Sequence, residues 1–404
     1  MKRLLNLLFG VVFMMAACAP APATPVPVAG TPVAPLVRVT PTAFPAAKLP
    51  VVAIQTPTPP PPPLPTIKIT TLQEHGGRMS WLGSKNKLAF DEVGKDGFAD
   101  VYTSNLDGSN KQCLTCNKIG IPQKHNGNPE WNPNGEYIVF QSEDPDFKTQ
   151  GLVLGEAMSS PAMGFNNNIW ITTADGSKFW EITHVYAMNG VLHPIFSTDG
   201  NKLMWFEMIA SGDIGQWVVK LADFSVRNGE PQVTNIQTLA PLSLQWYELH
   251  DFSPDHNSII FTGLPPGKWF YDTEIYRYGF ISQTTERLTQ NNEVDEHAHY
   301  SPDGKWIIWV SSTDIPQVRA SSLQDLTYHP IKTDVWIMNA DGSHKQRLTR
   351  FNDSNAMEGA HAPVGVTAGD IAWGPDSRSF ALRLQIGRDE SIVLVEFDPQ
   401  SLAY

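Results

Sequence analysis

The chain has few cations, and its body lacks a long hydrophobic run. Its 404 residues hold 29 Lys and Arg against 41 Asp and Glu, a formal net charge of −12. Binding to nucleic acid without sequence preference requires clustered cations that neutralise phosphates, so no nucleic-acid partner is expected. Beyond the N-terminus, no stretch reaches the roughly 18 apolar residues that span a bilayer.

The N-terminus is different and indicates the compartment. Lys2 and Arg3 precede an apolar segment, Leu4 to Met15, that is too short for a comfortable membrane span. Met15-Ala16-Ala17-Cys18 follows and resembles a bacterial lipobox, although Met stands where Leu is usual. We therefore expect residues 1–18 to be a lipoprotein signal peptide with lipidation at Cys18. The alternative is ordinary secretion with cleavage near Ala17. Lipidation predicts a location in the bacterial cell envelope, anchored on the extracytoplasmic side of a membrane, in the periplasm or on the cell surface.

Residues 19–66 are dominated by Pro, Ala, Thr and Val and end in five consecutive prolines, Pro59 to Pro63. Proline fixes φ and removes a backbone donor, so this segment forms neither helix nor sheet. We expect an extended linker that reaches on the order of 150 Å at about 3.1 Å per residue. It holds the globular part off the membrane, or it is only a disordered leader. The globular part is expected to span residues 67–404.

A repeated pattern fills residues 67–404, in which an aromatic residue precedes a tight turn and an apolar strand follows. The six copies of the segment before and through the turn are Met79–Ser84, Pro129–Gly135, Pro194–Gly200, His250–Asp255, Ala298–Gly304 and Ala372–Asp376. Pro, Asp or Asn, and Gly accept the tight geometry of such turns. We call the aromatic residue of each copy its anchor. The six anchors are Trp81, Trp131, Phe196, Phe252, Tyr300 and Trp373.

Most copies continue with two more strand patterns. A third strand such as Asp334–Ile337 runs into an Asp-Gly-Ser turn in three copies, at Asp107, Asp175 and Asp341. A fourth strand ends in a pair like Leu348-Thr349. Four short antiparallel strands in each of six units, about 50 to 70 residues apart, predict an all-β, six-bladed β-propeller.

The two ends of the repeat region predict how the propeller closes. The sixth unit has three strands by Phe397 and no clear fourth. Ile67–Leu72 is a strand pattern without a unit of its own. We expect this N-terminal strand to complete the last blade, which removes two open sheet edges.

The run Tyr300-Ser301-Pro302-Asp303-Gly304-Lys305, together with the Asp-Gly-Ser and Leu-Thr elements, resembles the PD40 (WD40-like) repeat of TolB-like six-bladed propellers. The resemblance covers Ile67 to the C-terminus, and units two and five match best. TolB is a periplasmic protein-binding scaffold, but it has an additional N-terminal domain without a counterpart here. Prolyl-oligopeptidase-like enzymes share the propeller and add an α/β-hydrolase domain, whose Gly-x-Ser-x-Gly elbow is absent here.

The resemblance implies that the first strand of each blade lines a central channel and that the loops leading into these strands share one face. Three long insertions, Glu143–Asn167, Ser311–Thr333 and Phe351–Gly369, are expected on the same face. Histidines and acids gather in these approaches, so we expect a binding face there. Its expected residues are His75, His125, His193, Glu248, His250, Glu296, His297, His299, Glu358 and His361.

Histidine and carboxylate at a channel mouth suit a divalent metal, and His193, His297 and His299 are the candidate ligands. His193 and His297 both lie three residues before their anchors and His75 and His125 both lie six before theirs, whereas the other histidines of these approaches differ in offset. The alternative is a polar channel lining without an ion. No other cofactor is expected.

Cys113-Leu114-Thr115-Cys116 lies on a predicted outer strand, with Cys113 where Arg287 and Arg347 stand in other units. A structural disulfide or a free pair is the favoured interpretation, because the βαβ setting of thioredoxin-like redox motifs and a second Cys pair are both absent. Redox or metal chemistry is the alternative.

These patterns favour a non-enzymatic, membrane-anchored binding scaffold for an envelope protein, peptide or glycan, and they assign no catalytic residue. Two alternatives stay open. One is a metal-dependent polysaccharide lyase or hydrolase, and the other is a structural subunit of an envelope complex.

Overall fold

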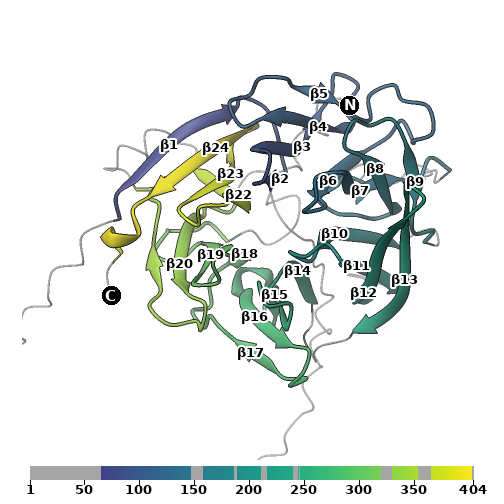
Figure 1. Cartoon of the computed structure of the whole chain (residues 1–404). Helices are drawn as coiled ribbons and strands as arrows, with labels where there is room; N and C mark the ends of the chain where they lie inside the picture. Colours follow the sequence, from purple (N-terminus) through teal and green to yellow (C-terminus); the bar gives the residue numbers. More distant parts are fainter. Residues whose placement is uncertain are drawn as a thin grey trace, which may run out of the picture.

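The computed structural model describes residues 65–146, 158–185, 189–210, 216–239, 244, 246–319, 330–353 and 365–402. Six four-stranded antiparallel sheets surround a central axis, with one strand of each sheet innermost (Figure 1). The predicted six-bladed, all-β propeller is therefore confirmed. The predicted signal peptide, Cys18 and nearly all of the linker lie outside the described residues.

The blades are numbered in chain order and their strands are given from the axis outward. Blade 1 holds β2 (Met79–Leu82), β3 (Lys87–Val93), β4 (Ala99–Asn105) and β5 (Gln112–Cys113); blade 2 holds β6 (Asn126–Trp131), β7 (Tyr137–Glu143), β8 (Asn167–Thr173) and β9 (Phe179–Glu181); blade 3 holds β10 (Gly190–Phe196), β11 (Lys202–Ala210), β12 (Gln216–Arg227) and β13 (Glu230–Leu239). Blade 4 holds β14 (Trp246–Phe252), β15 (Ser258–Leu264), β16 (Glu274–Gly279) and β17 (Thr285–Arg287); blade 5 holds β18 (Asp295–Tyr300), β19 (Trp306–Ser311), β20 (Asp334–Asn339) and β21 (Gln346–Arg347); blade 6 holds β22 (Val366–Trp373), β23 (Ser379–Ile386), β24 (Asp389–Phe397) and β1 (Ile67–Gln73).

The N-terminal strand closes the last blade, as predicted. β1 pairs antiparallel with β24, placing Ile67 opposite Phe397 and Ile69 opposite Val395. In Figure 1 the purple strand β1 lies beside the yellow strand β24. Ile67 and Ile69 pack against the buried cluster that blades 5 and 6 share. The two ends of the propeller are thus held by backbone pairing and by apolar contacts.

The outer half of blade 3 was not predicted from the repeat pattern. β12 and β13 form a long hairpin whose turn holds Asn228 and Gly229, both at positive φ. An Asn-Gly pair between alternating strands is a strong hairpin signal, and it was present in the sequence. The unit lacks the Asp-Gly-Ser and Leu-Thr elements that mark these strands elsewhere.

The turns after the inner strands fasten neighbouring blades at one end of the axis. Within the turn of blade 5, Ser301 Oγ donates to Asp303, and Gly304 takes φ of +71°. Between turns, Lys85 donates to the carbonyl of Gly135. Further contacts of this kind join Asn132 to Gly200, Thr198 to His256 and Ser377 to Asp303.

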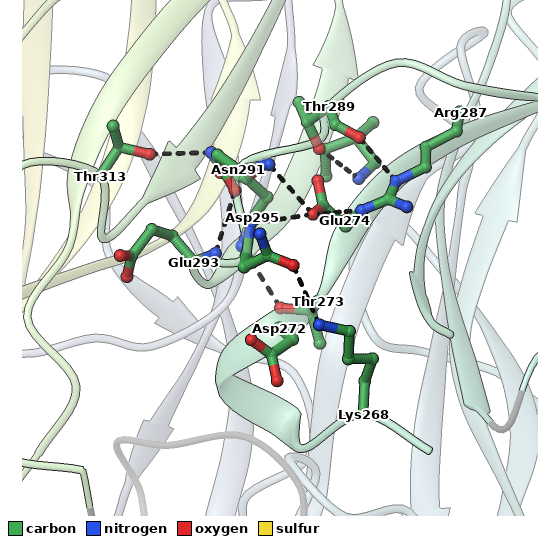
Figure 2. A network of polar contacts seen from close by, with 12 residues as sticks. Lys268, Asp272, Thr273, Glu274, Arg287, Thr289, Asn291, Glu293, Asp295 and Thr313 are labelled. Carbon is green, nitrogen blue, oxygen red and sulfur yellow. Dashed lines mark hydrogen bonds and ion pairs between the residues drawn. The ribbon is translucent and has the colours of Figure 1, made fainter. Parts of the chain in front are cut away.

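The Leu-Thr pairs also have a structural role. Thr289 Oγ1 accepts the backbone N–H of Ile275 at 2.9 Å, and Thr115, Thr183 and Thr349 repeat this contact in their blades. Figure 2 shows the surrounding network, in which Glu274 accepts hydrogen bonds from Arg287 and from the backbone of Asn291. Asp334 and Arg347 form the equivalent ion pair in blade 5.

Blade 1 replaces this ion pair by a covalent link. Cys113 stands where Arg287 and Arg347 stand, and a disulfide joins it to Cys116. The sequence favoured a structural disulfide or a free pair, and the structure has the disulfide. Among the described residues, no helix is long and apolar enough to cross a membrane.

Candidate functional site

A one-residue bulge interrupts five of the inner strands at nearly the same level. The register shifts between Gly127 and Glu130 in β6, and the equivalent shifts occur in β10, β14, β18 and β22. A bulge leaves one residue out of the ladder and re-aims its side chain. Here the bulges lie beside a cavity on the propeller axis.

Two layers of side chains line this axial cavity. The layer at the bulges, the bulge ring, consists of Arg78, Asn128, His193, His250, His297 and Asp370. The second layer lies one residue before each anchor and is called the anchor ring. It consists of Ser80, Glu130, Ile195, Asp251, His299 and Ala372. Each blade contributes one residue to each ring.

Three bulge-ring residues adopt a left-handed backbone conformation. φ is +52° at Asn128, +48° at His193 and +51° at His297. This conformation disfavours side chains other than Gly and costs of order 1–3 kcal/mol at each residue. Such outliers cluster at functional sites, so the backbone at His193 and His297 directs attention to their imidazoles.

The histidines gather around a buried carboxylate. Nε2 of His193 lies 2.5 Å from Oε1 of Glu248, whose side chain is 2% exposed. The other oxygen, Oε2 of Glu248, is buried without a hydrogen-bond partner. Glu248, His250 and His297 each place a potential ligand atom within 4.8 Å of the other two. A buried carboxylate with one unpartnered oxygen, close to two imidazoles, fits a cation between the three side chains.

The surroundings of His250 and His297 occupy one nitrogen of each ring. Nε2 of His250 lies 2.6 Å from Thr262 Oγ1 and 3.3 Å from the backbone N of His297; Nδ1 can bind a cation in the tautomer that carries the ring proton on Nε2 and donates it to Thr262. His297 Nδ1 lies 3.7 Å from Asp370. Burial lowers the pKa of both histidines, and neighbouring histidines lower that of His250 further, so both are neutral at neutral pH. A neutral imidazole is the form that binds a metal.

Blades 6 and 1 supply a buried network of charges on the other side of the ring. Asp370 lies between Arg78, at 3.9 Å, and Arg383, at 3.7 Å, and Arg383 also pairs with Glu390 at 2.5 Å. Burial disfavours the Asp370 anion, but His297 when protonated, Arg78 and Arg383 hold the pKa of this carboxyl well below its usual range. Burial raises the pKa of the adjacent Asp91 to about 6, although Arg78 opposes the shift.

The anchor ring brings two carboxyl groups into the same cavity. Burial raises the pKa of Glu130 to about 8, and the charge of Asp251 adds to the rise. Asp251 accepts the backbone N–H of Tyr300 at 3.1 Å and lies 3.7 Å from Nδ1 of His299. At neutral pH, Glu130 is therefore mostly a neutral acid beside a carboxylate that has other partners.

The cavity has a volume of about 240 Å³, which suits a small molecule or one unit of a chain. Three anchors, Trp81, Tyr300 and Trp373, contribute aromatic surface to its lining. Trp373 is fixed by a hydrogen bond from its indole to the carbonyl of His299. The lining thus combines flat apolar rings with hydrogen-bonding groups.

The predicted binding face is divided between several places. His193, His250, His297 and His299 meet in the axial cavity, with Glu248 and Glu296 buried near them. His75 lines a second cavity of about 300 Å³, together with Asp91, Glu92 and Arg388. His125 lies in neither lining. Its Nδ1 accepts the N–H of Ala99, and burial lowers its pKa to about 4. Glu358 and His361 lie outside the described residues.

Several cavity residues were missed in the sequence. Counting three residues back from every anchor, as for His193 and His297, gives Arg78, Asn128 and Asp370. Counting one residue back gives Glu130 and Asp251. The repeat register therefore contained this signal, but the offset from the anchor was considered only for the histidines. His250 has a different offset because the bulge of β14 falls on His250 itself.

The sequence matches no known protein-family model and none of the curated proteins compared with it. Among solved structures, a putative TolB from Agrobacterium tumefaciens is 15% identical, with a TM-score of 0.48 over 82% of this chain and 98% of that one. An oligogalacturonate lyase from Vibrio parahaemolyticus is 11% identical, with a TM-score of 0.49 over 84% and 98%. A second oligogalacturonate lyase, in complex with manganese, is 12% identical, with a TM-score of 0.46 over 83% and 92%. These likenesses concern the fold alone: the chain is a six-bladed β-propeller similar to those of TolB and oligogalacturonate lyase.

Proposed function

We propose that this protein is a membrane-anchored binding module that captures a glycan of the cell envelope in its axial cavity, with a divalent metal ion as part of the site. One observation carries the proposal. Glu248 has a buried Oε2 without a hydrogen-bond partner, and a carboxylate oxygen of Glu248 lies within 4.8 Å of ring nitrogens of His250 and His297, so three ligand atoms converge from two neighbouring blades.

The residues present fit a first-row divalent ion such as Zn²⁺ or Mn²⁺. One carboxylate and two imidazoles form a donor set that such ions accept, with room for water or a ligand oxygen. His193 would orient Glu248 through its short contact to Oε1, and Thr262 would hold the ring of His250. Metal sites depend on such supporting partners to fix the ligands. A bound ion would offer ligand oxygens a positive charge.

A glycan suits the remaining lining better than a flat protein surface does. The cavity is concave and small, and its aromatic anchors offer the flat faces on which sugar rings pack. Ser80, Glu130, Asp251 and His299 surround the same space with hydrogen-bonding groups for hydroxyls. A peptide or an envelope protein that inserts one side chain is the alternative partner.

The proposed location rests on the N-terminal sequence. Lipidation at Cys18 would attach the chain to a membrane, and the proline-rich segment 19–66 would separate the propeller from it. A binding module on such a tether samples the envelope around its anchor. The corresponding residues lie almost entirely outside the described part of the chain.

A second candidate function is a metal-dependent lyase or hydrolase. The observation that favours it is the pair Glu130 and Asp251, two carboxyl groups in one cavity with the metal-ligand cluster, because the pKa of Glu130 is raised. An acid kept neutral near neutral pH can act as a general acid.

The test is an array of envelope glycans probed with the full chain, with and without a chelator. We expect capture that the chelator abolishes and that Zn²⁺ or Mn²⁺ restores. His250→Ala should behave like the chelated protein, and His184→Ala, at an exposed site, should behave like the wild type. Equal glycan capture with and without the chelator would contradict the proposed role of the metal. Cleaved products after incubation would favour the enzyme.

A further inference from the structure

Glu130 occupies an unusual position for a carboxyl group. It precedes the anchor Trp131 in β6, and its side chain is partly exposed to the axial cavity. Among the described residues, no Lys, Arg or His forms an ion pair with it within 4.0 Å. Arg78, the cation of the cavity, pairs instead with Asp370. The wall around Glu130 therefore offers its anion little compensation.

A hydroxyl group fixes the carboxyl of Glu130 from the neighbouring blade. Ser80 Oγ accepts the backbone N–H of Trp131 at 3.1 Å and hydrogen-bonds the side chain of Glu130. Donation of the Ser80 hydroxyl proton to Glu130 lowers the pKa of this carboxyl and opposes the larger, raising effect of burial. One carboxyl oxygen thus accepts from Ser80, and the other can carry a proton toward the cavity.

The charges that face the cavity disfavour another anion. Asp251 from β14 is the charged group that acts on Glu130 directly, and Glu248 and Asp370 add negative charge at the bulge ring. The basic groups of this region, Arg78 and Arg383, are held by Asp370 and Glu390. His193 and His299 contribute imidazoles from the adjoining blades. A metal ion would offset part of the negative charge but would not invert it.

We propose that Glu130 is a neutral hydrogen-bond donor that makes the axial cavity selective for uncharged, hydroxyl-rich ligands, namely neutral saccharides. This inference rests on the proposed glycan-binding function and specifies its ligand class. The carboxylic O–H of Glu130 donates to a ring or hydroxyl oxygen of the sugar. The carboxylates of an acidic saccharide would meet Asp251 and Asp370, and Arg78, the cation of the lining, already lies 3.9 Å from Asp370.

The protonation of Glu130 is tested without a ligand. The side-chain carboxyl carbons of glutamate are followed by carbon-13 NMR in the full chain as the pH is raised. We expect one glutamate signal to titrate near pH 8, far above the usual value of about 4.3, and to vanish in Glu130→Gln. The exposed Glu136→Gln in the same blade should leave it in place. If the signal lost in Glu130→Gln titrates in the ordinary range, the inference is overturned.

The ligand class is tested on an array that holds neutral oligosaccharides and uronic-acid oligosaccharides of equal length. We expect the full chain to bind neutral members. Glu130→Ala should weaken that binding about tenfold, and Glu130→Gln, whose amide still donates, should retain it. Binding restricted to acidic saccharides, or to neither class, would overturn the inference.

The two tests separate this inference from the proposed metal site. A chelator acts on the ion and leaves the NMR signal of Glu130 readable. Loss of metal dependence together with a high pKa at Glu130 would contradict only the metal site. Metal-dependent capture together with an ordinary pKa at Glu130 would contradict only this inference.

Discussion

Nε2 of His193 lies 2.5 Å from one oxygen of Glu248, and the other oxygen of Glu248 is buried without a partner. The two residues come from β10 and β14, the inner strands of neighbouring blades. His193 therefore positions a carboxylate that points toward His250 and His297. The backbone of His193 is in the left-handed region, at φ of +48°, a strain that persists only where the surrounding structure holds the residue in place.

Replacing His193, a candidate ligand in the sequence that lies outside the cluster of Glu248, His250 and His297, should still weaken metal binding. His193→Ala frees Glu248 to rotate, and loss of such a supporting partner typically lowers metal affinity about 10- to 100-fold. Isothermal titration of the full chain with Zn²⁺ measures the effect. His184→Ala is the control, because His184 is exposed and distant from the cavity lining. Equal affinities for His193→Ala and the wild type would show that Glu248 needs no such support.

Glu130 should make the folded state less stable as the pH rises. Its pKa is about 8 in the folded chain against 4.5 ordinarily, so between these values the folded state holds a proton that the unfolded state has lost. Stability then falls by roughly 1.4 kcal/mol per pH unit from this group. Glu130→Gln should remove that slope. Urea unfolding at several pH values measures the free energy of unfolding of the wild type and of Glu130→Gln. If this free energy depends on pH in the same way in both proteins, the expectation is wrong.

Gly77 and Gly127 should resist substitution because both backbones approach the carboxyl group of Asp91. A Cβ at Gly77 would lie 2.2 Å from Oδ1 of Asp91, and one at Gly127 would lie 2.7 Å from Oδ2. Asp91 cannot easily move, since it accepts the N–H groups of Arg78 and Asn128. We expect Gly77→Ala to destabilise the fold by about 1–3 kcal/mol in denaturant unfolding.

The matched control for Gly77 is Gly279→Ala. A Cβ there would meet chiefly the Ser282 hydroxyl at 2.4 Å, in an exposed turn that can adjust. We expect a smaller loss of stability. Equal losses at the two sites would mean that Asp91 imposes no special constraint.

The closing strand should contribute to global stability. Ile67 and Ile69 of β1 pack on the core of blades 5 and 6, so replacing both by Ala should cost about 2–4 kcal/mol in thermal or denaturant unfolding. Lys68→Ala removes only a surface ion pair with Glu396 and should cost less than about 1 kcal/mol. A double variant as stable as the wild type would show that the last blade holds without β1.

The repeat pattern was sufficient to predict the fold, because turn chemistry and strand alternation are local properties. Closure by Ile67–Gln73 followed from counting strands. The predicted blade 3 lacked its two outer strands because β12 and β13 do not carry the turn motifs of the other blades.

The candidate site was predicted only in part. The axial histidines were recognised by residue type, whereas Glu130, Asp251 and Asp370 are found only by counting one or three residues back from their anchors. Which side chains meet across the axis depends on bulges, and a bulge is set by backbone geometry rather than by a sequence motif.

The proposed metal site is tested by the metal content of the full chain after equilibration with Zn²⁺ or Mn²⁺ and removal of free ion, measured by elemental analysis. We expect one ion per chain in the wild type and in His184→Ala. We expect none in a variant that combines Glu248→Gln with His250→Ala and keeps the circular dichroism of the folded protein. If the wild type binds no ion, or the folded variant binds as much as the wild type, the proposed metal site is wrong.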